Sequence, residues 1–233
     1  MPPAPAAEEF DLATVAIRDL NAALHAVPHG TNRRHFRVTN PRGAHSIAVG
    51  LTEPVQVDVM GPTGYYCAGM NKNATIEIHG HAGPGVAENI MSGVVRVRGN
   101  ASQYAAASGR GGLVIIEGDA ATRCGISMKG VDIVVGGSVG AMSAFLAQRG
   151  TLVVLGDAGE NLGDSLYEAR IFVRGKVASL GGDCVAKEMR ANHLAKLDRL
   201  LKAAGFDADP GSFTRYGSAR KLYHFHADQA DHY

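Results

Sequence analysis

A glycine recurs every nineteen residues through the middle of the chain. It follows a short aliphatic run seven times in succession, and no residue is inserted or lost between one repeat and the next. Because self-similarity at a fixed short period is typical of solenoid folds, this regular spacing constrains the fold more than any other feature. The seven positions are Gly61, Gly80, Gly99, Gly118, Gly137, Gly156 and Gly175.

The residues before each glycine predict one β-strand per repeat. Aliphatic side chains occupy the positions four and two residues before it, beginning with Val57 and Val59. This alternation at period two places both on one face of a strand. Nineteen residues are too few for a strand and a helical crossover, so each repeat is predicted to be one turn, or rung, of a parallel β-helix. A further rung is expected to begin at Phe36, because Val38 lies nineteen residues before Val57.

Small residues mark the corners of the predicted coil. The position three residues after the glycine holds only Gly, Ser or Ala, and the position seven after it holds only Ala or Gly. Such residues are expected where the backbone turns and neighbouring rungs crowd. With 30 glycines and no tryptophan, the composition also favours a turn-rich fold with a small aliphatic core. The predicted fold is all-β, a right-handed single-stranded parallel β-helix of about seven to eight 19-residue rungs.

The chain divides into three predicted segments. Residues 1–30 are expected to form an N-terminal arm and cap, residues 31–184 the β-helix, and residues 185–233 a C-terminal helix and tail. Both ends of a β-helix expose strand edges that invite aggregation, so the flanking segments are the natural covers.

Helical patterns appear in both flanking segments. Residues 11–26 have helical character, with Asp11 as the expected N-cap. Residues 185–204 form a clearer amphipathic pattern, and Gly205 is expected to end that helix. The tail over 207–233 is predicted to be mostly irregular.

The outward position three residues before each glycine changes character along the coil. The first three repeats place Asp58, Glu77 and Arg96 there, whereas the next four place large apolar side chains. An apolar strip of this size must be covered, and we expect the C-terminal helix to cover part of it and a partner subunit the rest. The strip consists of Ile115, Val134, Val153 and Phe172.

The sequence contains no recognised catalytic motif. It has no GxSxG, HExxH or CxxC pattern, and the glycine-rich residues 80–85 lack the following helix and Gly-Lys-Ser/Thr ending of a phosphate loop. Cys67 and Cys124 share a position three rungs apart, well beyond the roughly 7 Å between Cα atoms that a disulfide allows. Cys184 has no obvious partner. We therefore expect three free thiols, and no catalytic or cofactor-binding residue in this chain.

Two histidine pairs are weak metal candidates. His79 and His81 flank a repeat glycine, and His224 and His226 flank a phenylalanine in the tail, so either pair could place two imidazoles on one strand face. Neither pair has a third ligand at a typical spacing in the sequence. We therefore expect surface histidines and no bound metal. Carboxylates beside the glycines, such as Asp119, are accounted for by turn chemistry.

Charge and hydropathy exclude two classes of partner. The formal net charge is +1, which gives no electrostatic basis for binding nucleic acid or an anionic membrane. No segment approaches the roughly 20 consecutive apolar residues that span a bilayer. The first residues lack the pattern of a signal peptide, and with only three cysteines a cytoplasmic location is expected.

The coil resembles the C-terminal GXGXG domain of the large subunit of bacterial glutamate synthase over about residues 31–183. It is also similar to the β-helix subunit of formylmethanofuran dehydrogenase, so the repeat alone leaves both assignments open. The segments that carry the resemblance are GNASQYAAASGRGGLVIIEG (99–118), GDAATRCGISMKGVDIVVGG (118–137) and GDAGENLGDSL (156–166).

The ends of the chain favour the first assignment. Their sequences are FDLATVAIRDLNAALH (10–25) and FTRYGSARKLYHF (213–225), and they look like the stand-alone β-helix subunits of three-part synthases, N-methylglutamate synthase among them. The resemblance implies a non-catalytic structural subunit of a hetero-oligomer. Its partners would be a class II glutamine-amidotransferase-like subunit and a synthase subunit that carries FMN and an iron–sulfur cluster. Such a complex forms N-methylglutamate from methylamine and glutamate.

A carbohydrate-binding or carbohydrate-cleaving β-helix is a third possibility. Those enzymes need Asp, Lys or Arg clustered on adjacent rungs together with export from the cell. The outward positions are not expected to form such a cluster, and no secretion signal is found.

Overall fold

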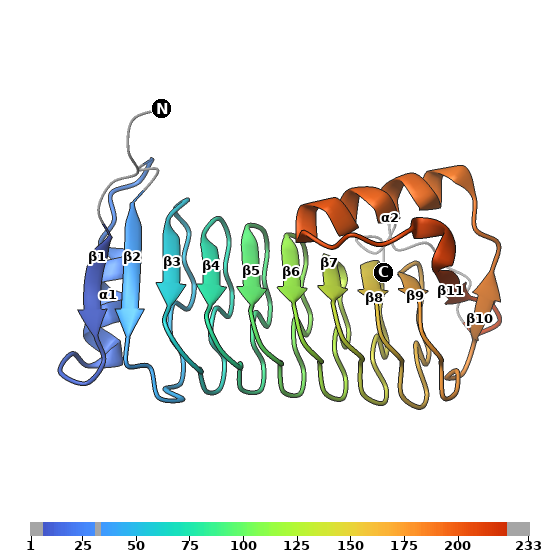
Figure 1. Ribbon diagram of the computed structural model, residues 1–233, viewed down its shortest axis with the longest axis horizontal. Helices are drawn as coiled ribbons and strands as arrows, with labels where there is room; N and C mark the ends of the chain where they lie inside the picture. Colours follow the sequence, from blue (N-terminus) through green and yellow to red (C-terminus); the bar gives the residue numbers. More distant parts are fainter. Residues whose placement is uncertain (1–6, 31–33, 223–233) are drawn as a thin grey trace.

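The nineteen-residue repeat forms a coil of stacked strands in the computed structural model, which describes residues 7–30 and 34–222 (Figure 1). Strands β2 to β9 pair in parallel and in sequence order. Residues nineteen apart face each other, so that Val57 pairs with Ile76 and Ile76 with Val95. The predicted right-handed parallel β-helix is confirmed.

The strands of the coil are short and similar in length. The rung expected to begin at Phe36 is present, since Phe36 pairs with Val57. An additional strand, β1, pairs in parallel with β2 at the N-terminal end. The bounds are β1 Glu8–Asp11, β2 His35–Thr39, β3 Gln56–Val59, β4 Thr75–Ile78, β5 Val94–Val97, β6 Leu113–Ile116, β7 Lys129–Val135, β8 Arg149–Val154 and β9 Arg170–Val173.

The core is a stack of aliphatic side chains inside the coil. Val57, Val59, Ile76 and Ile78 are fully buried, and the equivalent residues of the later strands are buried alike. Burying one such side chain stabilises a fold by about 1.5–3 kcal/mol. The period-two alternation in the sequence therefore describes the main stabilising contacts of the coil.

The recurring glycines are required by the close approach of neighbouring rungs. A Cβ atom at Gly80 would lie 2.7 Å from the carbonyl carbon of Gly61, and one at Gly156 would lie 2.7 Å from that of Gly137. The backbones hydrogen-bond at this point, with the Gly156 amide donating to the Gly137 carbonyl at 2.8 Å. Gly61 is the one member of the seven with a left-handed φ, 146°. A side chain would push the rungs apart.

The corner seven residues after the glycine is built from left-handed backbone. Ala68, Ala87 and Ala106 have φ values of 58°, 56° and 56° and are fully buried. This conformation costs an L-residue roughly 1–2 kcal/mol, which the stacking of successive rungs must offset. The expectation that this corner accepts only small side chains is consistent with that burial.

A helix covers the N-terminal end of the coil. Leu20 of α1 (Ile17–His25) is fully buried against the first rungs. The Asn21 side chain donates to the Ser46 carbonyl at 2.8 Å and accepts from the Ala48 amide at 3.0 Å. Because these backbone groups have no further rung to pair with, Asn21 replaces the missing strand.

The predicted start of this helix is wrong. The pattern over 11–26 places the N-cap at Asp11, but α1 begins at Ile17, with Ala16 in the N-cap position. Asp11 is instead the last residue of β1, and its carboxylate accepts a hydrogen bond from the Ala13 amide at 2.9 Å. An aspartate that bonds the amide two residues on forms a turn, and this turn separates strand from helix.

The C-terminal segment adds two strands that the sequence did not predict. The helix expected over 185–204 is shorter, and its first residues form a strand. The tail, predicted to be irregular, contains another strand, which lies between β9 and β10 and is antiparallel to both. Gly205 ends the helix with φ 81°, as expected. The bounds are β10 Cys184–Lys187, α2 Ala191–Ala204, the 3₁₀ turn Pro210–Ser212 and β11 Thr214–Ser218.

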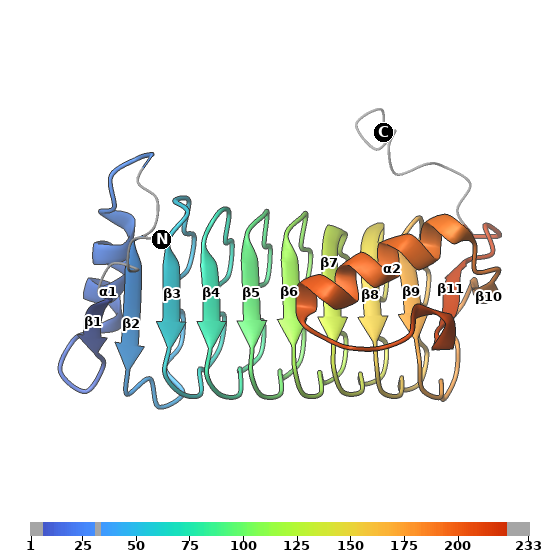
Figure 2. The same cartoon turned by 45° about the horizontal axis from the view of Figure 1, so that its top comes forward.

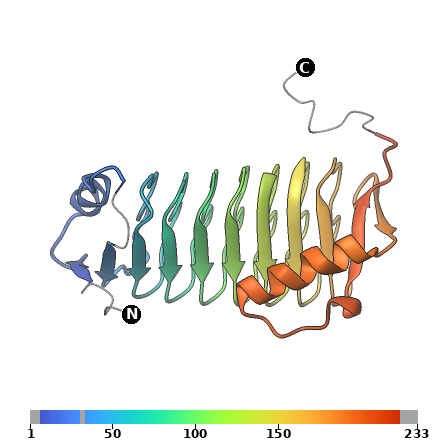
Figure 3. The same ribbon diagram turned by 90° about the horizontal axis from the view of Figure 1, so that it is seen from above.

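Helix α2 lies across the outer face of β6 to β9 (Figure 2), and the view in Figure 3 shows that it covers only this half of the coil. Leu197, Leu200 and Leu201 pack onto the apolar strip, whose side chains are at most 1% exposed. The expectation that a partner covers part of the strip is therefore wrong. The covered residues are Ile115, Val134, Val153 and Phe172.

Neither described helix is long and apolar enough to cross a membrane.

Candidate functional site

Charged side chains that form ion pairs with one another lie on the half of the outer strand face that α2 leaves uncovered. Arg98 contacts Glu77 at 2.6 Å and Glu117 at 2.5 Å, and Arg96 contacts Glu117 at 2.8 Å. The hydrogen bond from Arg98 to Glu77 is the main reason that the pKa of Arg98 is raised. The expectation that charged residues do not cluster on adjacent rungs is wrong. Here they cluster by pairing with one another.

A possible set of metal ligands lies at the edge of this charged face. Asp58, Glu77 and His79 each offer one ligand atom, and these atoms lie within 4.8 Å of one another. Both carboxylates already have close partners, because His35 lies 2.6 Å from Asp58 and Arg98 lies 2.6 Å from Glu77. A cation would have to displace both contacts, so the geometry favours an ion-paired surface.

Sequence reasoning missed this cluster because its members are distant in the chain. Proximity in sequence pairs His79 with His81, whereas the coil brings His79 beside Asp58 and Glu77, which are nineteen residues apart. The repeat already contained the signal, since residues nineteen apart share a position. His224 and His226 lie outside the described residues.

His81 belongs to a different feature, a line of side-chain bonds along one corner. Its Nδ1 accepts from the Asn100 amide at 2.9 Å, and the Asn100 side chain accepts from the Asp119 amide at 3.0 Å. Each bond joins residues nineteen apart, directly after the repeat glycine. The carboxylates at this corner are therefore structural, as turn chemistry predicted. The line runs through His81, Asn100, Asp119, Ser138, Asp157 and Lys176.

The three cysteines are buried free thiols, as expected. Burial raises the pKa of Cys67 and of Cys124 to about 12. Burial, followed by the charges of Asp183 and Asp164, raises the pKa of Cys184 to about 12. Thiols in this state are protonated at neutral pH and are poor nucleophiles.

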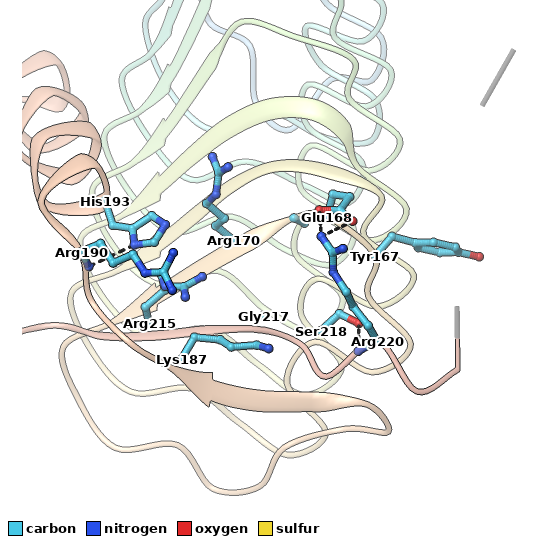
Figure 4. A pocket seen from close by; sticks show the side chains of 11 residues that line it. Tyr167, Glu168, Arg170, Lys187, Arg190, His193, Arg215, Gly217, Ser218 and Arg220 are labelled. Carbon is cyan, nitrogen blue, oxygen red and sulfur yellow. Dashed lines mark hydrogen bonds and ion pairs between the residues drawn. The ribbon is translucent and has the colours of Figure 1, made fainter. Parts of the chain in front are cut away.

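A pocket of about 370 Å³ lies where the C-terminal elements meet, and we call it the cap pocket (Figure 4). It lies beside the start of β9, the end of β10, the first turn of α2 and the strand β11. Cationic side chains from these elements and from the segment after β11 line it. They are Arg170, Lys187, Arg190, Arg215 and Arg220.

Positive charge in the cap pocket shifts the titration of two of its residues. Burial lowers the pKa of His193, and the charges of Arg215, Arg170 and Arg190 lower it further. Burial also lowers the pKa of Arg215, with Arg170 and Arg190 acting in the same direction. Arg170 and Arg190 therefore lie close enough to Arg215 to disfavour its charged form.

Carboxylates neutralise part of this charge. Arg220 contacts Glu168 at 2.9 Å, and Arg190 contacts Glu188 at 3.0 Å. Within residues 7–30 and 34–222, the side chains of Arg170 and Lys187 make no hydrogen bond or ion pair. The sequence did not predict the pocket, because its assembly depends on β11 pairing beside β9.

One known protein resembles the chain along nearly its whole length. Protein GlxC of Rhizobium meliloti (strain 1021) is 62% identical over 225 residues, which are 96% of this chain and 99% of GlxC. No family model matches the chain. No solved structure matches it.

Proposed function

The chain belongs to the same family as Protein GlxC, and from this premise we propose that it is the structural subunit of a glutamate-synthase-type complex. The likeness of its coil to the GXGXG domain of glutamate synthase supports this role. In the proposal it bridges a class II glutamine-amidotransferase-like subunit and a synthase subunit, and it performs no catalytic step. FMN and the iron–sulfur cluster belong to the synthase subunit. The specific reaction that we propose is that of N-methylglutamate synthase, which joins methylamine to glutamate.

The observation that carries the proposal is the exposure of large apolar side chains in one part of the coil. Tyr65, Met70 and Met91 are 50%, 41% and 44% exposed, and all three lie in the connections between β3 and β5. The ring of Tyr65 stacks on Tyr66, with centroids 5.5 Å apart. Aromatic residues and methionine are enriched at protein interfaces. Since α2 already covers the apolar strip, these side chains are the better candidates for a partner contact.

The dimensions of the coil suit a bridging role. Seven spacings separate β2 from β9, which at about 4.8 Å each makes a stack roughly 34 Å long. Parallel strands bond to both neighbours along this length, so the coil resists bending. A stiff surface of this length can hold two globular subunits at a fixed separation.

Co-purification with the two proposed partner chains tests this role. We expect the double variant Tyr65→Ala/Met91→Ala to lose most of its bound partner while the isolated chain keeps its melting temperature, because exposed side chains contribute little to stability. Leu180→Ala is the matched control, since Leu180 is 37% exposed at the other end of the coil.

Native mass spectrometry of the co-expressed chains gives the decisive readings. A partnerless monomer of this chain contradicts the proposal, as does equal recovery of partners by the double variant and the control. Molybdenum or tungsten in the purified complex indicates instead a role like that of the β-helix subunit of formylmethanofuran dehydrogenase.

A further inference from the structure

The cap pocket has a local excess of positive charge. Five cationic side chains line it, whereas the formal net charge of all 233 residues is +1. Its nearest counter-charges are Glu168, which contacts Arg220, and Glu188, which contacts Arg190. Among the described residues, Arg170, Lys187 and Arg215 form no ion pair with a carboxylate, although the charge of Glu188 acts on Arg215.

The strand pairing forces two of these cations together. Arg215 of β11 lies directly opposite Lys187 of β10 in the antiparallel ladder. Like charges at directly opposed positions destabilise a sheet. Arg215 is also only partly exposed, and its guanidinium donates to the Glu188 carbonyl at 2.9 Å, which fixes it in place without neutralising it.

The start of α2 adds to the positive potential. The helix begins after Arg190, and its first turn contains no acidic residue. The amino end of a helix carries a partial positive charge, which Asp or Glu in the first turn usually balances. His193 occupies that turn instead and is 9% exposed.

We propose that the cap pocket binds a small dianion, a phosphoryl group or a dicarboxylate. Its volume of about 370 Å³ falls within the range of sites for small molecules. Arginine forms paired, charge-assisted hydrogen bonds with both kinds of anion, and a helix amino end favours them as well. Figure 4 shows the side chains of Arg190, Arg215 and Lys187 near the same space, the first from the residue before α2 and the others from β11 and β10. A bound dianion supplies the counter-charge that the three unpaired cations lack.

Calorimetric titration of the full chain with inorganic phosphate and, separately, with glutarate tests the proposal. Chloride at equal ionic strength is the reference for non-specific screening. We expect saturable binding of at least one dianion, together with a raised melting temperature. Stronger phosphate binding identifies a phosphoryl ligand, and stronger glutarate binding identifies a dicarboxylate.

Two variants connect the binding to the pocket. The double variant Arg170→Gln/Lys187→Gln is expected to bind about tenfold more weakly or worse, because it removes two charge-assisted contacts. Both side chains reach solvent, so the fold is expected to persist. Arg18→Gln is the matched control, since Arg18 is 92% exposed on α1 at the opposite end.

Histidine titration gives a second reading, which is located in the pocket itself. Bound anion is expected to raise the pKa of His193 in NMR spectra. The proposal is wrong if neither dianion binds more strongly than chloride, or if the double variant and Arg18→Gln bind equally. Either result leaves the bridging role untouched, since that role depends on Tyr65 and Met91.

Discussion

The close packing of neighbouring rungs restricts many positions of this coil to residues with a small side chain or none. The repeat glycines sit where two backbones hydrogen-bond and nearly touch, so even a methyl group has no space. The alanines of the left-handed corner tolerate an unfavourable φ because they are small and buried. At both kinds of position, the packing of the neighbouring rung limits the size of the side chain.

Substitution of one repeat glycine tests this steric account. In Gly156→Ala the new Cβ would lie 2.7 Å from both the carbonyl carbon and the oxygen of Gly137, which are backbone atoms and cannot rotate away. We expect a loss of about 2–3 kcal/mol in the free energy of unfolding, measured by urea denaturation. Gly182→Ala is the control, because its nearest contact would be an ordinary 3.5 Å to Asp164. Equal losses in both variants would contradict the account.

His193 gives the C-terminal cap a pH dependence. Burial, then the neighbouring charges of Arg215, Arg170 and Arg190, lower its pKa from 6.5 in the folded chain, and Glu188 opposes this shift weakly. Well above pH 6.5 both the folded and unfolded chains hold a neutral imidazole, so the shift has no effect. Below it the unfolded chain takes up a proton more readily, so stability falls as the pH falls.

Melting temperatures measured from pH 7.5 to 5.5 test that sign. We expect the wild-type chain to lose more stability over this range than His193→Gln, whose side chain does not titrate. Parallel curves for the two proteins would show that His193 makes no contribution.

Among the elements, the repeated strands could be predicted and the caps only in part. The strand pattern of the coil occurs in every repeat, so an ambiguous position in one repeat can be assigned from the equivalent positions in the others. The segment 184–187 occurs once, and its helix-like pattern was overridden by pairing with β11, about thirty residues later. No local signal reveals such a partner. The cap pocket could not be predicted for the same reason. The cluster of Asp58, Glu77 and His79 could have been predicted from the repeat, because Asp58 and Glu77 are nineteen residues apart.

Helix α2 is expected to depend on the strip beneath it. Val134 is fully buried under α2, so Val134→Asp places a charge where water cannot reach it. We expect a cost of about 3 kcal/mol or more and early hydrogen exchange of the α2 amides. Gln56→Asp, at an exposed position of β3, is the control and should change neither quantity. Unchanged protection of α2 would mean that the strip is not what holds the helix.

At the scale of the whole molecule, the two ends are finished differently. At the N-terminal end α1 covers the coil, and Asn21 satisfies backbone groups of the first rungs. The C-terminal end is closed by β11, which pairs antiparallel with β9, and by β10, which pairs antiparallel with β11 at the outer edge. Stability along the coil is carried by contacts between neighbouring rungs, so each end needs its own cover.

Removal of the C-terminal closure should change the oligomeric state. A chain truncated after Gly182 loses α2, β10 and β11, which uncovers the edge of β9 and the apolar strip. We expect it to self-associate, seen as large species in sedimentation velocity, while the full chain does not. A monodisperse truncated monomer would contradict this expectation.

The reversal of strand direction at β11 also sets a limit on growth. A stack of identical parallel turns has no intrinsic stopping point, and fibrils elongate by adding one more strand in the same direction. β11 occupies the position where the next parallel turn would pair with β9, and β10 covers the other edge of β11. The chain itself therefore limits the number of turns, so the coil has a fixed length and does not extend into a filament.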